Sequence, residues 1–78
     1  MSTLAITKST NATDVWFSDL KMLVRLEDGR EIAVPVDWFP RLRDASEKDR
    51  NNWRLIGGGE GIHWDSIDED ILVEGLLK

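Results

Sequence analysis

The residue types of this chain that could do chemistry lie close together, between positions 57 and 70. Residues 57–61 are four glycines interrupted by Glu60, and the sole histidine, His63, follows them. Residues 65–70 then bring four carboxylates. A glycine-rich loop can cradle a phosphate, a histidine can transfer a proton, and clustered carboxylates can hold a hard cation. Each of these chemistries needs particular neighbouring residues.

The glycine run lacks the neighbours of a phosphate loop. A Walker loop continues into Lys and Ser or Thr, and a dinucleotide fingerprint lies between a strand and a helix of a βαβ unit. Here Glu60 lies inside the loop and Trp64-Asp65 follows it. Because these carboxylates would repel an anion, we expect the glycines to permit positive φ angles and close backbone approach instead.

His63 would have to support any histidine-based catalysis alone, with serine or carboxylate partners. Asp65 and Ser66 are near it in sequence, but adjacent residues of a strand point to opposite faces. We therefore interpret His63 as a packed or half-exposed strand residue. A glycosidase-type pair of carboxylates would need a deep cleft, for which one small core leaves little room. The chain is predicted not to be an enzyme.

Metal and cofactor sites are restricted by the absence of cysteine and the single histidine. Zinc sites with thiolate ligands and sites with several histidines cannot be built. The carboxylates of residues 65–70 are natural ligands of calcium, but their spacing does not match an EF-hand loop. We favour a solvated acidic turn, or one that pairs with Arg41, Arg50 or Arg54, and expect neither a metal nor a cofactor.

The length of 78 residues limits the core. It suits one domain, and a domain of this size buries only about 60% of the surface that its unfolded chain exposes. No disulfide can add stability, which leaves packing or self-association as a homo-oligomer. The four tryptophans are spread through the chain, so we interpret them as large side chains that fill a small core. A tryptophan-lined ligand groove is the alternative.

Charge is divided unevenly along the chain, whose net charge is −5. Residues 41–54 carry five basic and three acidic side chains, whereas residues 60–74 carry six acids and no Lys or Arg. This acidic segment argues against nucleic-acid binding, which requires a basic face, and suits a basic protein partner. Internal pairing with the arginines is the alternative. No signal peptide or membrane-spanning segment is evident, so we expect a cytoplasmic protein without a membrane partner.

Alternating apolar residues predict a β-hairpin in the first half of the chain. In residues 20–26 every second position is apolar, beginning with Leu20, and the same pattern returns in residues 32–36. Both rows should face the core. Residues 14–17 are a further β-favouring run, with a turn at Ser18-Asp19 before the hairpin.

Side-chain parity selects the turn of this hairpin. A two-residue turn at Asp28-Gly29 would split the apolar rows across both faces. A three-residue loop over residues 27–29 instead pairs Val24 with Ile32 and puts both rows on one face. We therefore predict a type I turn with Gly29 left-handed and a G1 bulge.

The middle of the chain is predicted to be helical. Pro35 should close the preceding strand. Asp37 is then a reasonable N-cap for a short helix with Pro40 in its first turn. Ser46, followed by an acid three residues later, should begin a second helix that runs towards Trp53.

The ends of the chain complete the fold prediction. Residues 1–11 are interpreted as a flexible tail and residues 12–78 as a single domain. Residues 62–64 should return to the sheet as a strand, and residues 71–77 are ambiguous, with a final helical turn over residues 74–77 favoured. The expected fold class is α+β: a small antiparallel sheet, a three-stranded meander plus a returning strand, packed on two short helices.

Several motifs make the sequence recognisable: Trp38-Phe39-Pro40-Arg41-Leu42, Gly59-Glu60-Gly61-Ile62-His63-Trp64 and Asp68-Glu69-Asp70-Ile71. With Asp28-Gly29-Arg30, they resemble the bacterial family named domain of unknown function 2442, over residues 12–77. The resemblance implies a small α+β fold without established catalytic residues. It also implies a neighbouring gene for a second small domain, with which a toxin and antitoxin pairing has been suggested. Some relatives continue into a DNA-binding helix-turn-helix, which is not present in this sequence.

Together these observations favour a non-enzymatic protein-interaction module, an antitoxin-like partner of a small basic protein encoded by the neighbouring gene. The alternative is a small-molecule-binding regulatory domain with a tryptophan-walled pocket near the glycine loop. Direct binding of nucleic acid is not expected. The candidate binding residues are Trp38, Arg41, Arg54, His63 and Trp64.

Overall fold

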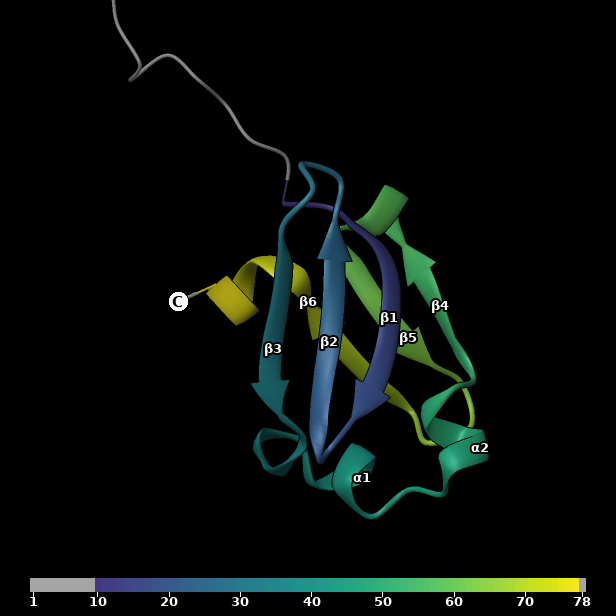
Figure 1. The fold of residues 1–78 in the computed structure, drawn as a ribbon. Helices are drawn as coiled ribbons and strands as arrows, with labels where there is room; N and C mark the ends of the chain where they lie inside the picture. The colour runs from purple at the N-terminus through teal and green to yellow at the C-terminus, as the bar shows by residue number, and fades with distance from the viewer. Residues whose placement is uncertain (1–9, 78) are drawn as a thin grey trace, which may run out of the picture.

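The computed structural model describes residues 10–77, which form two antiparallel three-stranded sheets stacked as layers (Figure 1). The first sheet has the order β1-β2-β3, with β1 (Ala12–Ser18), β2 (Lys21–Leu26) and β3 (Glu31–Pro35). The second has the order β4-β5-β6, with β4 (Trp53–Ile56), β5 (Gly61–Trp64) and β6 (Glu69–Leu72). The predicted tail, residues 1–11, lies outside the described residues except for its last two positions.

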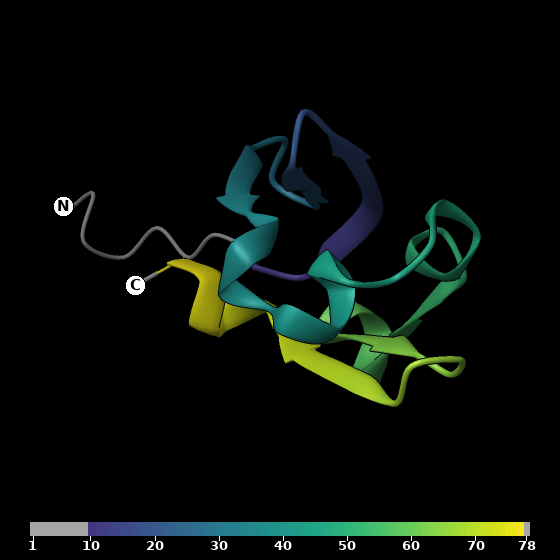
Figure 2. The ribbon, with the colours of Figure 1, turned by 90° about the horizontal axis from the view of Figure 1, so that it is seen from below.

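Short helices connect and complete the sheets. Between them in the chain lie η2 (Val36–Trp38), α1 (Pro40–Arg43) and α2 (Glu47–Arg50), and Figure 2 shows these turns across one end of the two layers. The 3-10 turn η3 (Gly57–Gly59) joins β4 to β5, and η4 (Val73–Leu77) follows β6. The α+β class is confirmed, and η4 confirms the predicted final helical turn.

The returning strand differs from the prediction. Residues 62–64 do form a strand, β5, but it joins a second sheet rather than the first. The reason is β4: the second helix ends at Arg50 instead of reaching Trp53, and Trp53 begins a strand that pairs with β5. The apolar pair at residues 55–56 therefore belongs to a hairpin, which a four-residue strand makes hard to detect from periodicity.

The core lies between the two sheets. From the first sheet it takes the alternate residues of β2, each at most 1% exposed, and Val15 and Val34. From the second it takes Ile62, Trp64 and Ile71. Trp64 is fully buried, as expected of a tryptophan that fills a small core, whereas Trp38 is 57% exposed and does not fit that interpretation. The Nε1 of Trp64 donates to the carbonyl oxygen of Arg50 at 2.9 Å, so the indole leaves no unpaired donor.

The register of the β2–β3 hairpin is confirmed. Val24 lies opposite Ile32, and Leu26 N donates to Arg30 O at 2.8 Å. The turn is closed by Gly29 N, which donates to Leu26 O at 3.0 Å, and the φ of Gly29 is +94°. These features belong to the three-residue loop that parity selects. Pro35 is the last residue of β3, as expected.

Leu20 was expected in the buried row, and this is wrong. It lies in the tight turn between Ser18 and Lys21, which pair at the ends of β1 and β2. Asp19 and Leu20 have φ angles of +49° and +66°, and the Leu20 side chain is 78% exposed. A two-residue hairpin loop with two positive φ angles matches the twist of its strands, so the turn geometry overrides the alternation.

Of the two N-cap predictions, one is confirmed and one is wrong. Ser46 begins α2, and its hydroxyl accepts from Asp49 N at 3.1 Å, as predicted. Pro40 occupies the first turn of α1, also as predicted. Asp37 does not cap that helix, because it lies inside η2 and the residue before α1 is Phe39. Because of this extra 3-10 turn, two residues separate Asp37 from Pro40, the first residue of α1.

Arg50 stabilises the end of α1. Its Nε donates to Leu42 O and its Nη2 donates to Arg43 O, both at 2.8 Å. Its guanidinium carbon lies 5.9 Å from the centre of the Phe17 ring. The last carbonyls of a helix have no partner within the helix, so a cation placed there satisfies them and complements the helix dipole.

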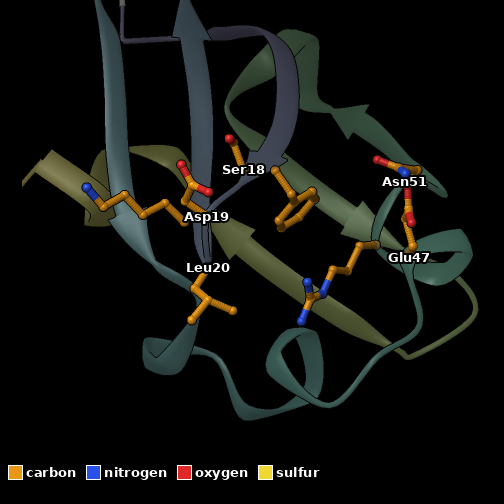
Figure 3. A pocket seen from close by; sticks show the side chains of 8 residues that line it. Ser18, Asp19, Leu20, Glu47 and Asn51 are labelled. Atoms are coloured by element: carbon orange, nitrogen blue, oxygen red, sulfur yellow. The ribbon is translucent and has the colours of Figure 1, made fainter.

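Arg50 also borders a hollow of about 200 Å³ between the β1–β2 turn and α2. Figure 3 shows Ser18, Asp19 and Leu20 on the turn side of this hollow, with Glu47 and Asn51 across from them. The hollow is mostly polar in its lining residues and smaller than a common small-molecule pocket, about 300–1,000 Å³.

Gly59 explains part of the glycine run. Its φ is +105°, and a Cβ at this position would lie 2.5 Å from the carbonyl oxygen of Ala12. The η3 turn therefore approaches the start of β1 at a point where only glycine fits. This confirms the structural interpretation of close backbone approach.

Candidate functional site

A row of polar side chains crosses the outer face of the second sheet. Arg54 of β4 lies opposite His63 of β5, which in turn lies opposite Asp70 of β6. Asp65 follows β5 two positions after His63 and joins the same group. We call these four residues the histidine cluster. Alternation places them on one face, since the neighbouring residues Ile62, Trp64 and Ile71 point into the core.

Both ring nitrogens of His63 contact carboxylates. Nε2 lies 2.7 Å from Oδ1 of Asp65, and Nδ1 makes a short contact with Oδ1 of Asp70. The ring is 18% exposed, whereas both carboxylates are more than half exposed. The hydrogen bond to Asp70 is the main reason why the pKa of His63 is raised, and the bond to Asp65 adds to it. The geometry favours an imidazolium that donates from both nitrogens.

Arg54 ties the cluster to β4. Its Nε and Nη2 donate to the two carboxylate oxygens of Asp65, at 3.3 and 3.4 Å. This fork, together with His63, lowers the pKa of Asp65. Asp65 thus lies between two cations, and the cluster holds two positive and two negative groups when His63 is protonated. Its charges balance, so it is a poor anion or cation trap.

The contacts of His63 favour one of its protonation states. Its two carboxylate partners stabilise the imidazolium, which can donate a proton but cannot accept one. Within residues 10–77 no three His, Cys, Asp or Glu side chains are grouped to hold a metal ion. The arrangement instead fixes the positions of β4, β5 and β6 relative to one another on the solvent side.

A groove opens beside the cluster, along the outer edge of β6. Its floor and walls come from η2, β6 and η4, and its volume is about 360 Å³. The residues that line it are Trp38, Phe39, Asp70, Ile71, Leu72, Gly75 and Leu76. We call it the β6 groove. Its side chains are mostly apolar, and Asp70 links it to the histidine cluster.

Two large apolar side chains at the β6 groove are exposed to solvent. Trp38 is 57% exposed and Leu72 is 60% exposed. The only other large apolar side chain as exposed among residues 10–77 is Leu20, which lies in the β1–β2 turn and does not line this groove. Exposed apolar residues that gather around one concave site mark a contact surface more often than scattered ones do.

The five predicted binding residues lie at four different places in the structure. Arg54 and His63 meet in the histidine cluster, and Trp38 lies in the β6 groove beside it. Arg41 donates from Nη1 to Asp68 O at 2.6 Å, which fastens α1 to the turn before β6. Trp64 is buried in the core and cannot contact a partner directly.

Asp70 and Leu72 were missed as site residues. Residues 65–70 were interpreted as one acidic turn, but Glu69 and Asp70 already belong to β6. The turn ends at Asp68, whose φ of +52° reverses the chain. Pairing residues 62–64 with the apolar run that starts at Ile71 would have indicated both residues.

Comparisons with known proteins agree with this fold. A family model described as "Protein of unknown function (DUF2442)" matches residues 12–78. The chain belongs to this family. The resemblance inferred from the sequence motifs is thereby confirmed. No match at the required significance was found among functionally curated proteins.

A crystal structure of a protein of unknown function from Rhodospirillum rubrum ATCC 11170 is similar to the chain, with a TM-score of 0.75 and 28% sequence identity. The match covers 86% of this chain and 83% of that one. The same fold is therefore present in a second protein, which is described as one of unknown function. Within residues 10–77, every helix of this DUF2442 protein is too short or too polar to cross a bilayer.

Proposed function

We propose that this protein is a non-enzymatic interaction module of the bacterial cytoplasm that binds a small basic protein through the β6 groove. The observation that carries the proposal is the exposure of Trp38 and Leu72 at one concave, mostly apolar site. Tryptophan is among the residues that contribute most to binding energy at protein interfaces. The family resemblance suggests that the partner is encoded by the neighbouring gene, in an antitoxin-like pairing.

Charge supports a basic partner. Residues 60–74, which include β5, β6 and the start of η4, carry six acids and no Lys or Arg. Such a field would attract a cationic protein and speed its association. The mostly apolar groove would then supply the short-range contacts.

Co-expression with the neighbouring gene product, followed by size exclusion at micromolar concentration, tests the proposal. Trp38→Ala should remove the co-elution, because it deletes the exposed anchor of the groove. Leu20→Ala is the matched control, because Leu20 is even more exposed but does not line the groove. Separate elution of the two wild-type proteins, or equal loss in both variants, would contradict the proposal.

A small-molecule regulatory domain is the competing hypothesis. Trp64 is buried in the core and therefore does not wall a solvent-open pocket near the glycine loop. The hollow beside Arg50, at about 200 Å³, is small for a metabolite. A thermal-shift screen separates the two ideas, since a ligand that binds only the folded state raises the melting temperature.

A further inference from the structure

The backbone of β6 can accept another strand. β6 lies at the edge of the β4-β5-β6 order, and within the described part of the chain no strand pairs with its other side. Unpaired edge strands are templates for pairing with another chain. β6 carries no proline that would remove a donor. It is short and begins with the charged residues Glu69 and Asp70, which disfavour pairing with an acidic strand and leave a basic strand as the suitable partner.

Register identifies the backbone groups that point outwards. Val73 N donates to Glu60 O at 2.9 Å, so these two residues form a hydrogen-bonded pair of the β5–β6 ladder. Such pairs alternate along an antiparallel ladder, which makes Ile62 and Ile71 the next one. Asp70 and Leu72 then belong to non-hydrogen-bonded pairs, and their N–H and C=O groups point away from β5.

Two of these outward groups are best placed for a partner. Asp70 N already donates to its neighbour Glu69 at 3.2 Å, and the carbonyl of Leu72 stands at the N-cap of η4, where it accepts the first helical bond. That leaves Asp70 C=O and Leu72 N–H. In an added parallel strand, the residue opposite Ile71 would donate its N–H to Asp70 C=O and accept a hydrogen bond from Leu72 N–H. A residue of an antiparallel strand would instead need both the N–H and the C=O of a single β6 residue.

The β6 groove lies along this same edge. Asp70, Ile71 and Leu72 form one wall, and Trp38 of η2 and the following residue, Phe39, line it as well. A strand added to β6 would therefore place alternate side chains against Trp38 and Leu72. Glu69, Glu74 and Asp68 lie on or beside β6, so acids outnumber Arg41, the cation that donates to Asp68 O at the start of this edge. A segment with apolar residues that alternate with Lys or Arg fits both features.

We propose that the partner of this module docks by adding an extended, basic segment as a parallel fourth strand on β6, with an apolar side chain in the β6 groove. This inference rests on the proposed function, because it specifies how the partner binds at the same site. The main-chain bonds would give affinity, and the groove would select the side chains.

The test uses a phage-displayed library of random linear peptides, selected against the full chain, and synthetic versions of the enriched peptides. Nuclear magnetic resonance titrations of the isotope-labelled protein should show the largest amide proton shift at Leu72. Methylation of the one peptide nitrogen that faces Asp70 C=O should weaken binding at least about tenfold, because it removes a bond and adds a clash. Methylation of the next nitrogen should have little effect.

Orientation and charge are measured separately. A spin label at the peptide amino end should broaden the Glu69 amide more than the Gly75 amide, and the reverse pattern would exclude a parallel strand. Enriched peptides should contain Lys or Arg at alternate positions and should bind several-fold more weakly to Glu69→Gln. Glu47→Gln is the control, because Glu47 lines the hollow beside Arg50 and not the β6 groove.

Selected peptides that shift amides elsewhere, or a library without enriched peptides, would overturn the strand-addition inference. The proposed function fails separately. If the neighbouring gene product elutes with the protein but leaves the amides of Asp70 and Leu72 unshifted, the interaction stands and the strand addition is wrong.

Discussion

Replacing Arg50 by Met should cost this domain a large share of its stability. The substitution keeps the aliphatic stem but removes donors to Leu42 O and Arg43 O, both at 2.8 Å. Hydrogen bonds to charged groups contribute about 1.5–3 kcal/mol each, and the solvent-exposed bond to Arg43 O should contribute less than the partly buried bond to Leu42 O. We expect a loss of about 2–3 kcal/mol in the free energy of unfolding. At roughly 0.05–0.15 kcal/mol per residue, a domain of this length has only about 4–12 kcal/mol.

Urea denaturation followed by tryptophan fluorescence measures this loss. For a domain of this size, the melting temperature should fall by about 10–20 °C. Arg43→Met is the matched control, because Arg43 makes only an exposed ion pair with its neighbour Asp44, and its loss should change little. Arg50→Lys should recover part of the stability, since one ammonium cannot reproduce the fork. If Arg50→Met and Arg43→Met are equally stable, Arg50 does not cap α1.

Three further predictions follow from particular residues. Leu20→Gly should stabilise the fold by about 0.5–1 kcal/mol in urea denaturation, because φ is +66° and the side chain is exposed; a loss of stability would show that the leucine makes contacts. Gly59→Ala should cost more than Gly58→Ala by about 1–2 kcal/mol, because both have positive φ but only Gly59 would place Cβ against Ala12; equal costs would contradict the close approach. Because the pKa of His63 is raised, its contribution to the free energy of unfolding is complete below pH 6.5 and is lost as pH rises through the folded-state pKa. His63→Gln should flatten this dependence of stability on pH. An unchanged dependence would exclude His63 as its source.

The sequence predicted the first half of the fold well because its signals are local. Parity alone selected the three-residue loop before Arg30, and a serine with an acid three residues on marked the start of α2. Leu20 was misplaced because alternation does not reveal where a strand gives way to a turn. Its position in a two-residue loop depends on the pairing of Ser18 with Lys21.

The second half was less accessible because its strands are short. β4, β5 and β6 have four residues each, too few for alternation to be distinct from a helical pattern. The candidate site residues were chosen by residue type, which does not reveal whether a side chain is buried. Trp64 proved to be core, whereas Leu72, an ordinary residue by type, lies 60% exposed at the groove.

The acidic segment near the C-terminus is partly paired with cations in the structure, which its sequence does not reveal. Of the six acids in residues 60–74, Asp65 pairs with Arg54 and Asp70 pairs with His63 when that ring is protonated. The other four acids make no ion pair within residues 10–77. Charges on an exposed surface are screened beyond about 8–10 Å at physiological salt, and they raise association rates more than they lower dissociation rates. Added salt should therefore slow the association of a basic partner more than it speeds its release. In the proposed interface, discrimination between partners would then depend on the groove, because apolar contacts of Trp38 and Leu72 would not be weakened by salt.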